Sequence, residues 1–302
     1  MILKLGIVAK ASLPDFVNID DAGEGRVQDM RQAFQDAVKL ARVAAATFDP
    51  CEEVYQRYFT ALDAVFVHNI FKTLANMPLE IELDENTSLE LLSSEAVTSL
   101  NPMFSKLEIS LGDHPDIPES AKHCSTSSTT AAFCYTSRAL GDWAYISLCD
   151  TIWQYPSLSE IEHSSDPSKR GEPGWGCDGI GDHDSEYMTS PGGILLHEML
   201  HWYGLFQDVP YFDQVIEENS VGIPQIGDFQ GPKPPDGYGS FHAQQLRSVD
   251  NADNFRVYAE SKYWGFTCRR SFKGSTDTAD DELRTSQRST QLPPINDDGS
   301  LE

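Results

Sequence analysis

The sequence predicts an α+β fold that is mostly helical and carries a small mixed or antiparallel sheet. Two long segments near the N-terminus, residues 24–48 and about 50–76, repeat apolar residues at helical spacing. A third helix is expected at 190–202, where a serine and a proline precede an apolar run. The segments 106–111 and 143–149 show the pattern of strands, so both element types are expected.

The helix expected over residues 24–48 presents one apolar stripe, formed by Val27, Met30, Phe34, Val38, Ala41 and Ala45. Residues 49–52 then supply a cap, a first-turn proline and a capping-box acid, which predicts the start of the second helix. That helix should reach about residue 76 and bury Val54, Tyr58, Ala61, Leu62, Val65, Phe66, Ile70 and Leu74. Two later helices are expected near 240–248 and 253–264.

The expected sheet is built from short segments. A strand is predicted at 2–9 and another at 106–111. The β-prone end of 124–136 is expected to pair antiparallel with 143–149. Such a pair would offer an edge strand along which an extended peptide can bind.

We expect one folded domain over residues 1–272. Its N-terminal helical part covers about 24–76, and a second part that carries the motifs below covers about 124–265. Residues 273–302 are polar and rich in Ser, Thr and Asp, which predicts a flexible tail.

The acidic net charge of the chain limits the classes of partner that it is expected to bind. Its 302 residues carry 22 Lys plus Arg against 47 Asp plus Glu, for a formal net charge of -25. Nucleic acids and anionic membrane surfaces both require a basic face, so neither is expected as a partner. No apolar run reaches the length of a membrane span. We expect a monomer.

The cysteine usage predicts an oxidising compartment. The chain has 6 cysteines without a CxxC pair, which disfavours a zinc ribbon and allows up to three disulfides. A glycosylation sequon at Asn86 is compatible with secretion. The first residues lack the long apolar stretch of a signal peptide, so we expect the mature form of a secreted protein with an added Met1.

Residues 190–202 contain a motif whose side chains could bind a metal ion. His197 and His201 lie four residues apart, so on a helix both imidazoles leave the same face and can bind one Zn²⁺. Glu198 can hold and deprotonate a water beside that metal, as in the HExxH arrangement of zinc peptidases. The alternative is a buried helix with two hydrogen-bonded core histidines.

Two histidines leave zinc in need of at least one more protein ligand. A thermolysin-like enzyme would use a glutamate such as Glu217 or Glu218, but the residues around them show a poor helical pattern. A metzincin-like enzyme would continue as HExxHxxGxxH. Gly204 fits that pattern, but Gln207 stands at the ligand position and Asp208 is one residue late.

A different zinc-peptidase pattern matches further along the chain. Tyr238-Gly239 precedes a predicted helix, and Asn251-Ala252-Asp253-Asn254-Phe255 follows it. Together with the HExxH motif, and with strands that end at Tyr135-Thr136 and Leu148-Cys149, these segments resemble the aspzincins. Those are deuterolysin-like secreted zinc endopeptidases of fungi. The resemblance covers about residues 124–265 and implies a zincin-like fold.

The resemblance also implies site residues. The family's third zinc ligand is an Asp shortly before a Tyr-Gly, and its usual pattern places two residues between them. Here Asp236 is one residue too close to Tyr238, whereas Asp228 has a suitable Ile-Gly-Asp-aromatic context with an insertion after it. We favour Asp228 as the ligand and keep Asp236 as the alternative. Tyr238 resembles the tyrosine that stabilises the oxyanion, or it is an aromatic cap of the following helix. Asp253 matches an Asp that holds the site loop or meets a basic P1′ side chain, or it caps the last helix.

The function expected from the sequence is that of a secreted metalloendopeptidase with one Zn²⁺ per chain. Its substrates would be proteins or peptides, and Glu198 would act as the general base. The alternative is a secreted zinc-binding effector or pseudoenzyme that keeps the site without efficient proteolysis. The unusual Asp–Tyr spacing motivates this alternative.

Overall fold

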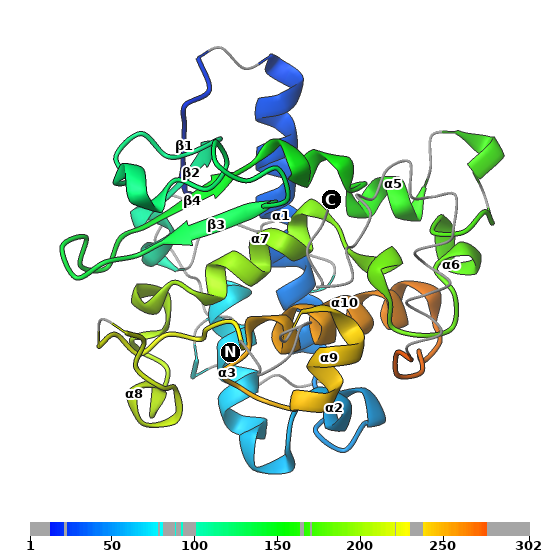
Figure 1. Cartoon of the computed structure of the whole chain (residues 1–302). Helices are drawn as coiled ribbons and strands as arrows, with labels where there is room; N and C mark the ends of the chain where they lie inside the picture. Colours follow the sequence, from blue (N-terminus) through cyan, green and yellow to red (C-terminus); the bar gives the residue numbers. More distant parts are fainter. Residues whose placement is uncertain are drawn as a thin grey trace, which may run out of the picture.

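A mixed sheet lies along one side of a helical body (Figure 1). The computed structural model describes residues 13–20, 23–77, 79–80, 88, 92, 101–163, 166–169, 171–220, 222–229 and 238–276. Within this part of the chain the sheet has four strands in the order β1-β2-β4-β3. They are β1 (Asp15–Val17), β2 (Leu107–Leu111), β4 (Ala144–Leu148) and β3 (Ala132–Tyr135).

The register of the sheet leaves β3 at its edge. β1 pairs parallel with β2, and β2 pairs parallel with β4, while β3 pairs antiparallel with β4. The α+β class, the mixed sheet and the antiparallel pair are therefore confirmed. The strand expected at 2–9 lies outside the described residues.

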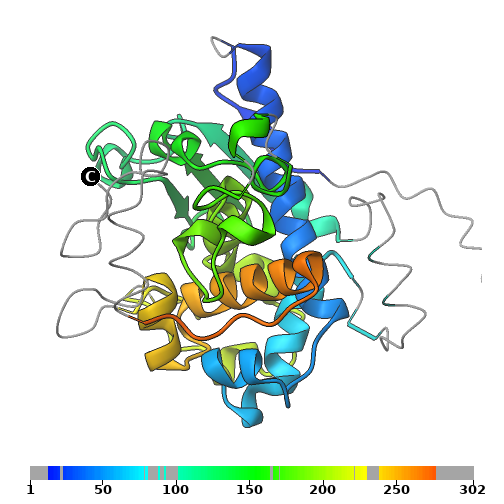
Figure 2. The ribbon, with the colours of Figure 1, turned by 90° about the vertical axis from the view of Figure 1, so that its right-hand side faces the viewer.

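Helix α1 (Glu24–Ala46) is the central helix and packs against α7 (Pro191–Leu200), α10 (Ala252–Cys268) and α3 (Ala64–Leu74). Figure 2 shows α10 running across the molecule at a steep angle to α1. The predicted helices at 24–48, 190–202 and 253–264 are thus confirmed, as is the one near 240–248, which is α9 (Gly239–Leu246).

Small residues let α7 approach its neighbours closely. A Cβ added to Gly192 would lie only 2.4 Å from Cβ of Asp36 on α1. On the other side of α7, a Cβ added to Gly193 would lie 2.0 Å from a carboxylate oxygen of Glu260 on α10. The two glycines therefore set how deeply the motif helix sits between α1 and α10.

The second long helix predicted at about 50–76 is wrong, because the chain breaks it in two. Helix α2 (Glu53–Tyr58) ends at Phe59, which is extended with φ -140 and ψ 168. Thr60 then starts a new turn, since its backbone N–H and its hydroxyl both donate to Asp63, at 3.0 and 2.6 Å. A 3₁₀ turn (Ala61–Asp63) leads into α3.

The break has a physical cause in the core. Phe59 is fully buried, with its ring centroid 4.9 Å from that of Phe255 and 5.7 Å from that of Tyr258. The interruption shifts the helical phase, so that Leu62 is 96% and Val65 76% exposed, against the prediction that both face inward. Ala61 is exposed as well.

Shorter elements complete the described part of the chain: α5 (Leu158–Glu162), α6 (Gly176–Gly179) and α8 (Phe212–Val215). Disulfides join Cys124 to Cys149 and Cys177 to Cys268. Cys51 and Cys134 are free. The two disulfides favour an oxidising environment. Among the described residues, no helix has the length and apolar character of a membrane span.

Candidate metal centre

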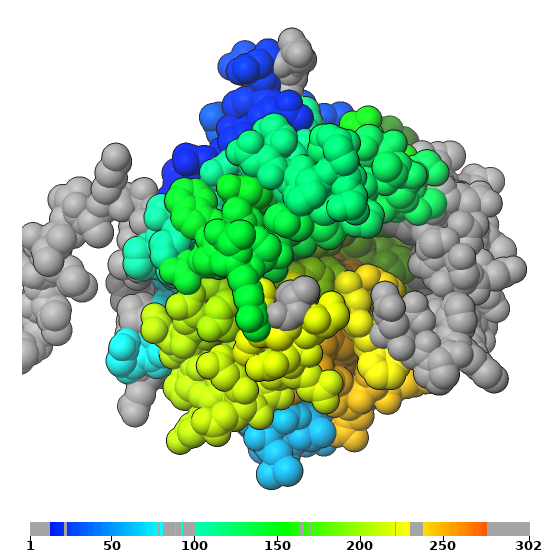
Figure 3. All heavy atoms as spheres, turned by 60° about the vertical axis from the view of Figure 1, so that its left-hand side comes forward, coloured from blue at the N-terminus to red at the C-terminus, as the bar shows by residue number. Residues whose placement is uncertain are grey.

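His197 and Glu198 lie on α7, and His201 directly follows this helix. Figure 3 shows a hollow in the surface between the sheet and the segments after residue 200. Ser190 caps α7, because its Oγ accepts a hydrogen bond from the N–H of Gly193 at 3.2 Å. His197 and Glu198 lie in its last turns, and His201 is its C-cap. The two imidazole centroids lie 4.9 Å apart, so both rings leave the same face as expected.

Asp228 comes to the two histidines from a separate segment. Its loop is fixed to the start of α10, since Gly227 N–H donates to Asp250 O and Ala252 N–H donates to Gly227 O, at 3.1 and 2.9 Å. Asn251 adds a side-chain contact, because its Oδ1 accepts from the N–H of Phe229 at 3.0 Å. These bonds determine where the Asp228 carboxylate lies.

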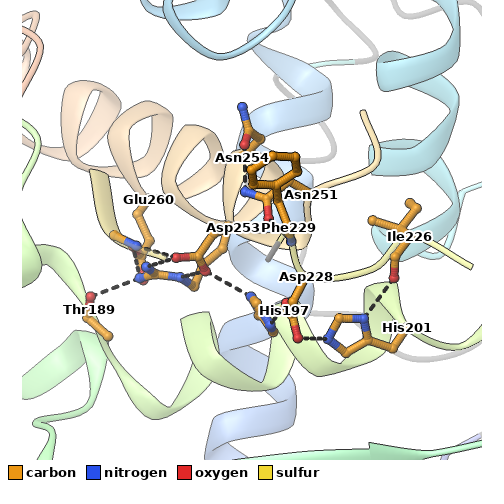
Figure 4. A network of polar contacts seen from close by, with 12 residues as sticks. Thr189, His197, His201, Ile226, Asp228, Phe229, Asn251, Asp253, Asn254 and Glu260 are labelled. Atoms are coloured by element: carbon orange, nitrogen blue, oxygen red, sulfur yellow. Dashed lines mark hydrogen bonds and ion pairs between the residues drawn. The ribbon is translucent and has the colours of Figure 1, made fainter. Parts of the chain in front are cut away.

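The three side chains form a possible metal site. Nε2 of His197 lies 3.0 Å from Oδ1 of Asp228, and Nε2 of His201 lies 3.5 Å from its Oδ2 (Figure 4). One donor atom from each residue lies within 4.8 Å of the others. Oδ1 of Asp228 is buried and faces Nε2 of His197. Two imidazole nitrogens and one carboxylate oxygen are a donor set that a divalent metal accepts, so the group could hold a metal ion. Asp236 lies outside the described residues.

Further contacts orient both imidazoles. Nδ1 of His197 lies 2.8 Å from Oδ1 of Asp253, and Nδ1 of His201 lies 2.7 Å from the backbone oxygen of Ile226. Because the oxygen partners hold a proton on each Nδ1, both Nε2 atoms are directed to the Asp228 carboxylate. This is the arrangement in which imidazoles bind metals.

The electrostatics of the group show that a proton and a metal ion would compete for it. Burial disfavours the charged form of His197, but the carboxylates of Asp228 and Asp253 outweigh burial and raise its pKa well above the ordinary value. Burial likewise acts to raise the pKa of Asp228, and the two histidines outweigh it and lower that pKa. A divalent cation would replace the histidine proton as the partner of Asp228.

Glu198 lies on the same helix next to the edge strand β3. Its side chain is buried, and burial raises its pKa, although His201 and His197 oppose the shift. The backbone of Cys134, on β3, also hydrogen-bonds this carboxylate. A buried carboxylate with a raised pKa beside a possible metal site has the properties of a general base.

The structure brings Tyr238 to this site. Tyr238 is the N-cap residue of α9, but its side chain makes no cap hydrogen bond. Its ring instead stacks on that of His197, with centroids 5.8 Å apart and an interplanar angle of 23°. The hydroxyl hydrogen-bonds to the Asp228 carboxylate. Tyr238 is 43% exposed, so a bound ligand can reach it.

Asp253 lies in the first turn of α10, whose N-cap residue is Asn251, and its carboxylate belongs to the site. Besides His197, its carboxylate accepts a hydrogen bond from the N–H of Gly239 at 2.6 Å. Arg256 donates to both of its oxygens, at 2.7 and 2.9 Å. The sequence interpretation left Arg256 out. Its signal was the spacing of Asp253, Arg256 and Glu260 at i, i+3 and i+7, which places all three on one helix face.

Neither a protein-family model nor a curated protein matches the chain.

Proposed function

We propose that this protein is a zinc-dependent metalloendopeptidase with a zincin-like fold. The observation that supports the proposal best is the convergence of His197, His201 and Asp228 beside the buried carboxylate of Glu198. A purely structural cluster would not require an additional acid at this position. The zincin-like fold and the secreted location are parts of the same proposal.

Zinc is the metal that best suits this donor set. Catalytic zinc sites use three protein ligands from His and Asp or Glu and leave one position for water. When bound, Zn²⁺ would supply Lewis acidity, which polarises a peptide carbonyl and makes water a stronger acid. His197, His201 and Asp228 would hold it.

Glu198 would carry the proton in the reaction. Its carboxylate accepts a proton from the attacking water and then donates it to the nitrogen of the leaving amine. The burial that raises its pKa favours both halves of this transfer, because a group with a pKa nearer neutrality accepts and releases a proton more readily.

Tyr238 would stabilise the negative charge that develops on the carbonyl oxygen. Tyr238 is 43% exposed and its hydroxyl is a hydrogen-bond donor, so it could interact with a substrate carbonyl. To do so, the hydroxyl must exchange its hydrogen bond to Asp228 for one to the substrate.

The edge strand supports the choice of a peptide as substrate. Among the described strands, β3 pairs only with β4, and it packs against α7. An extended peptide could add to β3 through main-chain hydrogen bonds while its scissile bond lies over Glu198.

The decisive experiment combines metal analysis with a peptide-library assay. We expect about one zinc per chain, cleavage within peptides, loss of cleavage on chelation and recovery on adding Zn²⁺. A protein that never binds zinc when it is supplied would refute the metal part. A zinc-loaded protein that cleaves no library peptide would refute the peptidase part.

A zinc-binding protein without efficient turnover is the second candidate. It is favoured by the hydrogen bond between the Tyr238 hydroxyl and Asp228, which engages the proposed oxyanion donor within the site itself. The same assay separates the two candidates, because this one predicts zinc without cleavage.

A further inference from the structure

Arg256 on α10 is buried and forms a bidentate ion pair with the carboxylate of Asp253. Its Nε donates to Oδ1 at 2.7 Å and its Nη2 to Oδ2 at 2.9 Å. The third nitrogen, Nη1, is held by Glu260 Oε2 and by Thr189 Oγ1, each at 2.9 Å. Every end of the guanidinium therefore has a fixed partner.

The Asp253 carboxylate that Arg256 binds has two further hydrogen-bond partners in the metal centre. Oδ1 of Asp253 contacts Nδ1 of the metal-site histidine His197, and Oδ2 accepts the N–H of Gly239. Gly239 directly follows Tyr238, whose ring stacks on His197. One carboxylate thus fixes both a possible metal ligand and the backbone beside the proposed oxyanion donor.

We propose that Arg256 is a positioning residue that acts through Asp253 to hold His197 and the Tyr238 segment in one arrangement. The metal-binding half of this inference stands on the geometry alone, and its catalytic half rests on the proposed function. The guanidinium fork fits both carboxylate oxygens at once, which fixes the plane of the carboxylate. Without it, the carboxylate can rotate away from His197 or Gly239.

The test measures metal affinity, which does not require that the protein be an enzyme. Arg256→Met removes the charge and the fork while keeping a long side chain. We expect its affinity for Zn²⁺, or for Co²⁺ followed by absorption, to fall roughly 10- to 100-fold, the usual effect of losing a residue that orients a ligand. Arg256→Lys keeps the charge without the fork and should lose less.

Arg57 provides a matched control. It forms an ion pair with Asp184, and neither residue belongs to the possible metal ligands or to the direct partners of His197 and His201 named above. The side chains of this pair are 8% and 0% exposed, compared with 7% and 3% for Arg256 and Asp253. Arg57→Met therefore breaks an equally buried pair. It should lower thermal stability and leave the metal affinity of the folded protein unchanged.

A double-mutant cycle tests whether Arg256 acts through Asp253. Asp253→Asn should weaken metal binding, and the double variant with Arg256→Met should bind no more weakly than Asp253→Asn alone. Additive losses would overturn the inference, as would native affinity in Arg256→Met. If Arg256→Met does not fold, native affinity in Arg256→Lys would overturn it instead. Should the wild-type protein bind metal but cleave no peptide, the proposed function fails while these affinities still decide the inference.

Discussion

Nε2 of His197 lies 3.0 Å from Oδ1 of Asp228, although the two residues come from a helix and from a distant loop. The contact pairs a histidine whose pKa is raised with an aspartate whose pKa is lowered. With His201 beside them, the two residues form a group that could hold a metal ion.

Replacing Glu198 should separate metal binding from turnover. Glu198→Gln keeps the size and an oxygen but cannot accept the proton, so zinc should remain while the rate falls roughly 10²- to 10⁴-fold. His201→Ala should instead lose the metal. Both are checked by zinc analysis and peptide cleavage on the same preparations, and a native rate in Glu198→Gln would mean that the assigned mechanism is wrong.

Two single substitutions test which aspartate is the third metal ligand. Asp228→Ala should weaken zinc binding strongly, because it removes the only carboxylate among the three donors and leaves two neutral imidazoles. Asp236→Ala should leave zinc affinity near that of the wild type. Titration with zinc decides between them, and the reverse result would assign the ligand to Asp236.

Tyr238→Phe should affect the chemical step more than binding. It removes a hydroxyl whose charge-stabilising role arises only in the transition state, so kcat should fall roughly 10²- to 10³-fold with KM changed little. Zinc content should stay native. Steady-state kinetics on a single peptide gives both constants, and an unchanged kcat would reduce Tyr238 to an aromatic neighbour of His197.

Zinc affinity should rise with pH. The raised pKa of His197 means that it keeps its proton to higher pH than an ordinary histidine in the metal-free protein, while Asp228 is ionised because its pKa is lowered. Zinc must displace that proton, so affinity should increase up to about tenfold per pH unit until the pH passes the pKa of His197.

The same pair has a consequence for the stability of the metal-free protein. A raised histidine pKa contributes stability at low pH, and this contribution is lost as the pH rises through the folded-state pKa. A lowered aspartate pKa contributes stability above the unfolded-state pKa, and this contribution is lost in acid.

Asp253→Asn removes one carboxylate that raises the His197 pKa, so the rise in zinc affinity should move to lower pH. A zinc affinity that is independent of pH between about pH 5 and 8 would contradict both the expected rise with pH and its expected shift in Asp253→Asn.

Gly192→Ala should destabilise the protein, although it substitutes none of the site residues. The added Cβ would lie 2.4 Å from Cβ of Asp36 and 3.0 Å from the backbone nitrogen of Ala37, which forces α7 away from α1. We expect a loss of about 1–3 kcal/mol in the free energy of unfolding. Gly25→Ala is the control, because nothing lies within 4 Å of its added Cβ. Equal melting temperatures for the two variants would refute the close approach.

Local patterns carried much of the prediction. The cap at Ser190, the apolar run after it and the spacing of His197 and His201 are all properties of neighbouring residues on one helix, and the structure has them as expected. The α+β class and the antiparallel β3–β4 pair were likewise visible as periodicity. Periodicity misled where the core overrode it: the burial of Phe59 interrupts the helix predicted at 50–76 and leaves Leu62 exposed.

The sequence by itself determined the helix that carries His197, Glu198 and His201, because helical geometry fixes how residues four apart are placed. Only the tertiary structure decided which distant groups meet them. The loop that bears Asp228 is brought in by its backbone bonds to the start of α10, and Asp253 reaches His197 because α10 packs against α7. Such meetings depend on long-range packing and on shared buried hydrogen bonds, which no local spacing encodes. For the same reason the bond from Arg256 to the Asp253 carboxylate, and from there to His197, becomes apparent only in the folded chain.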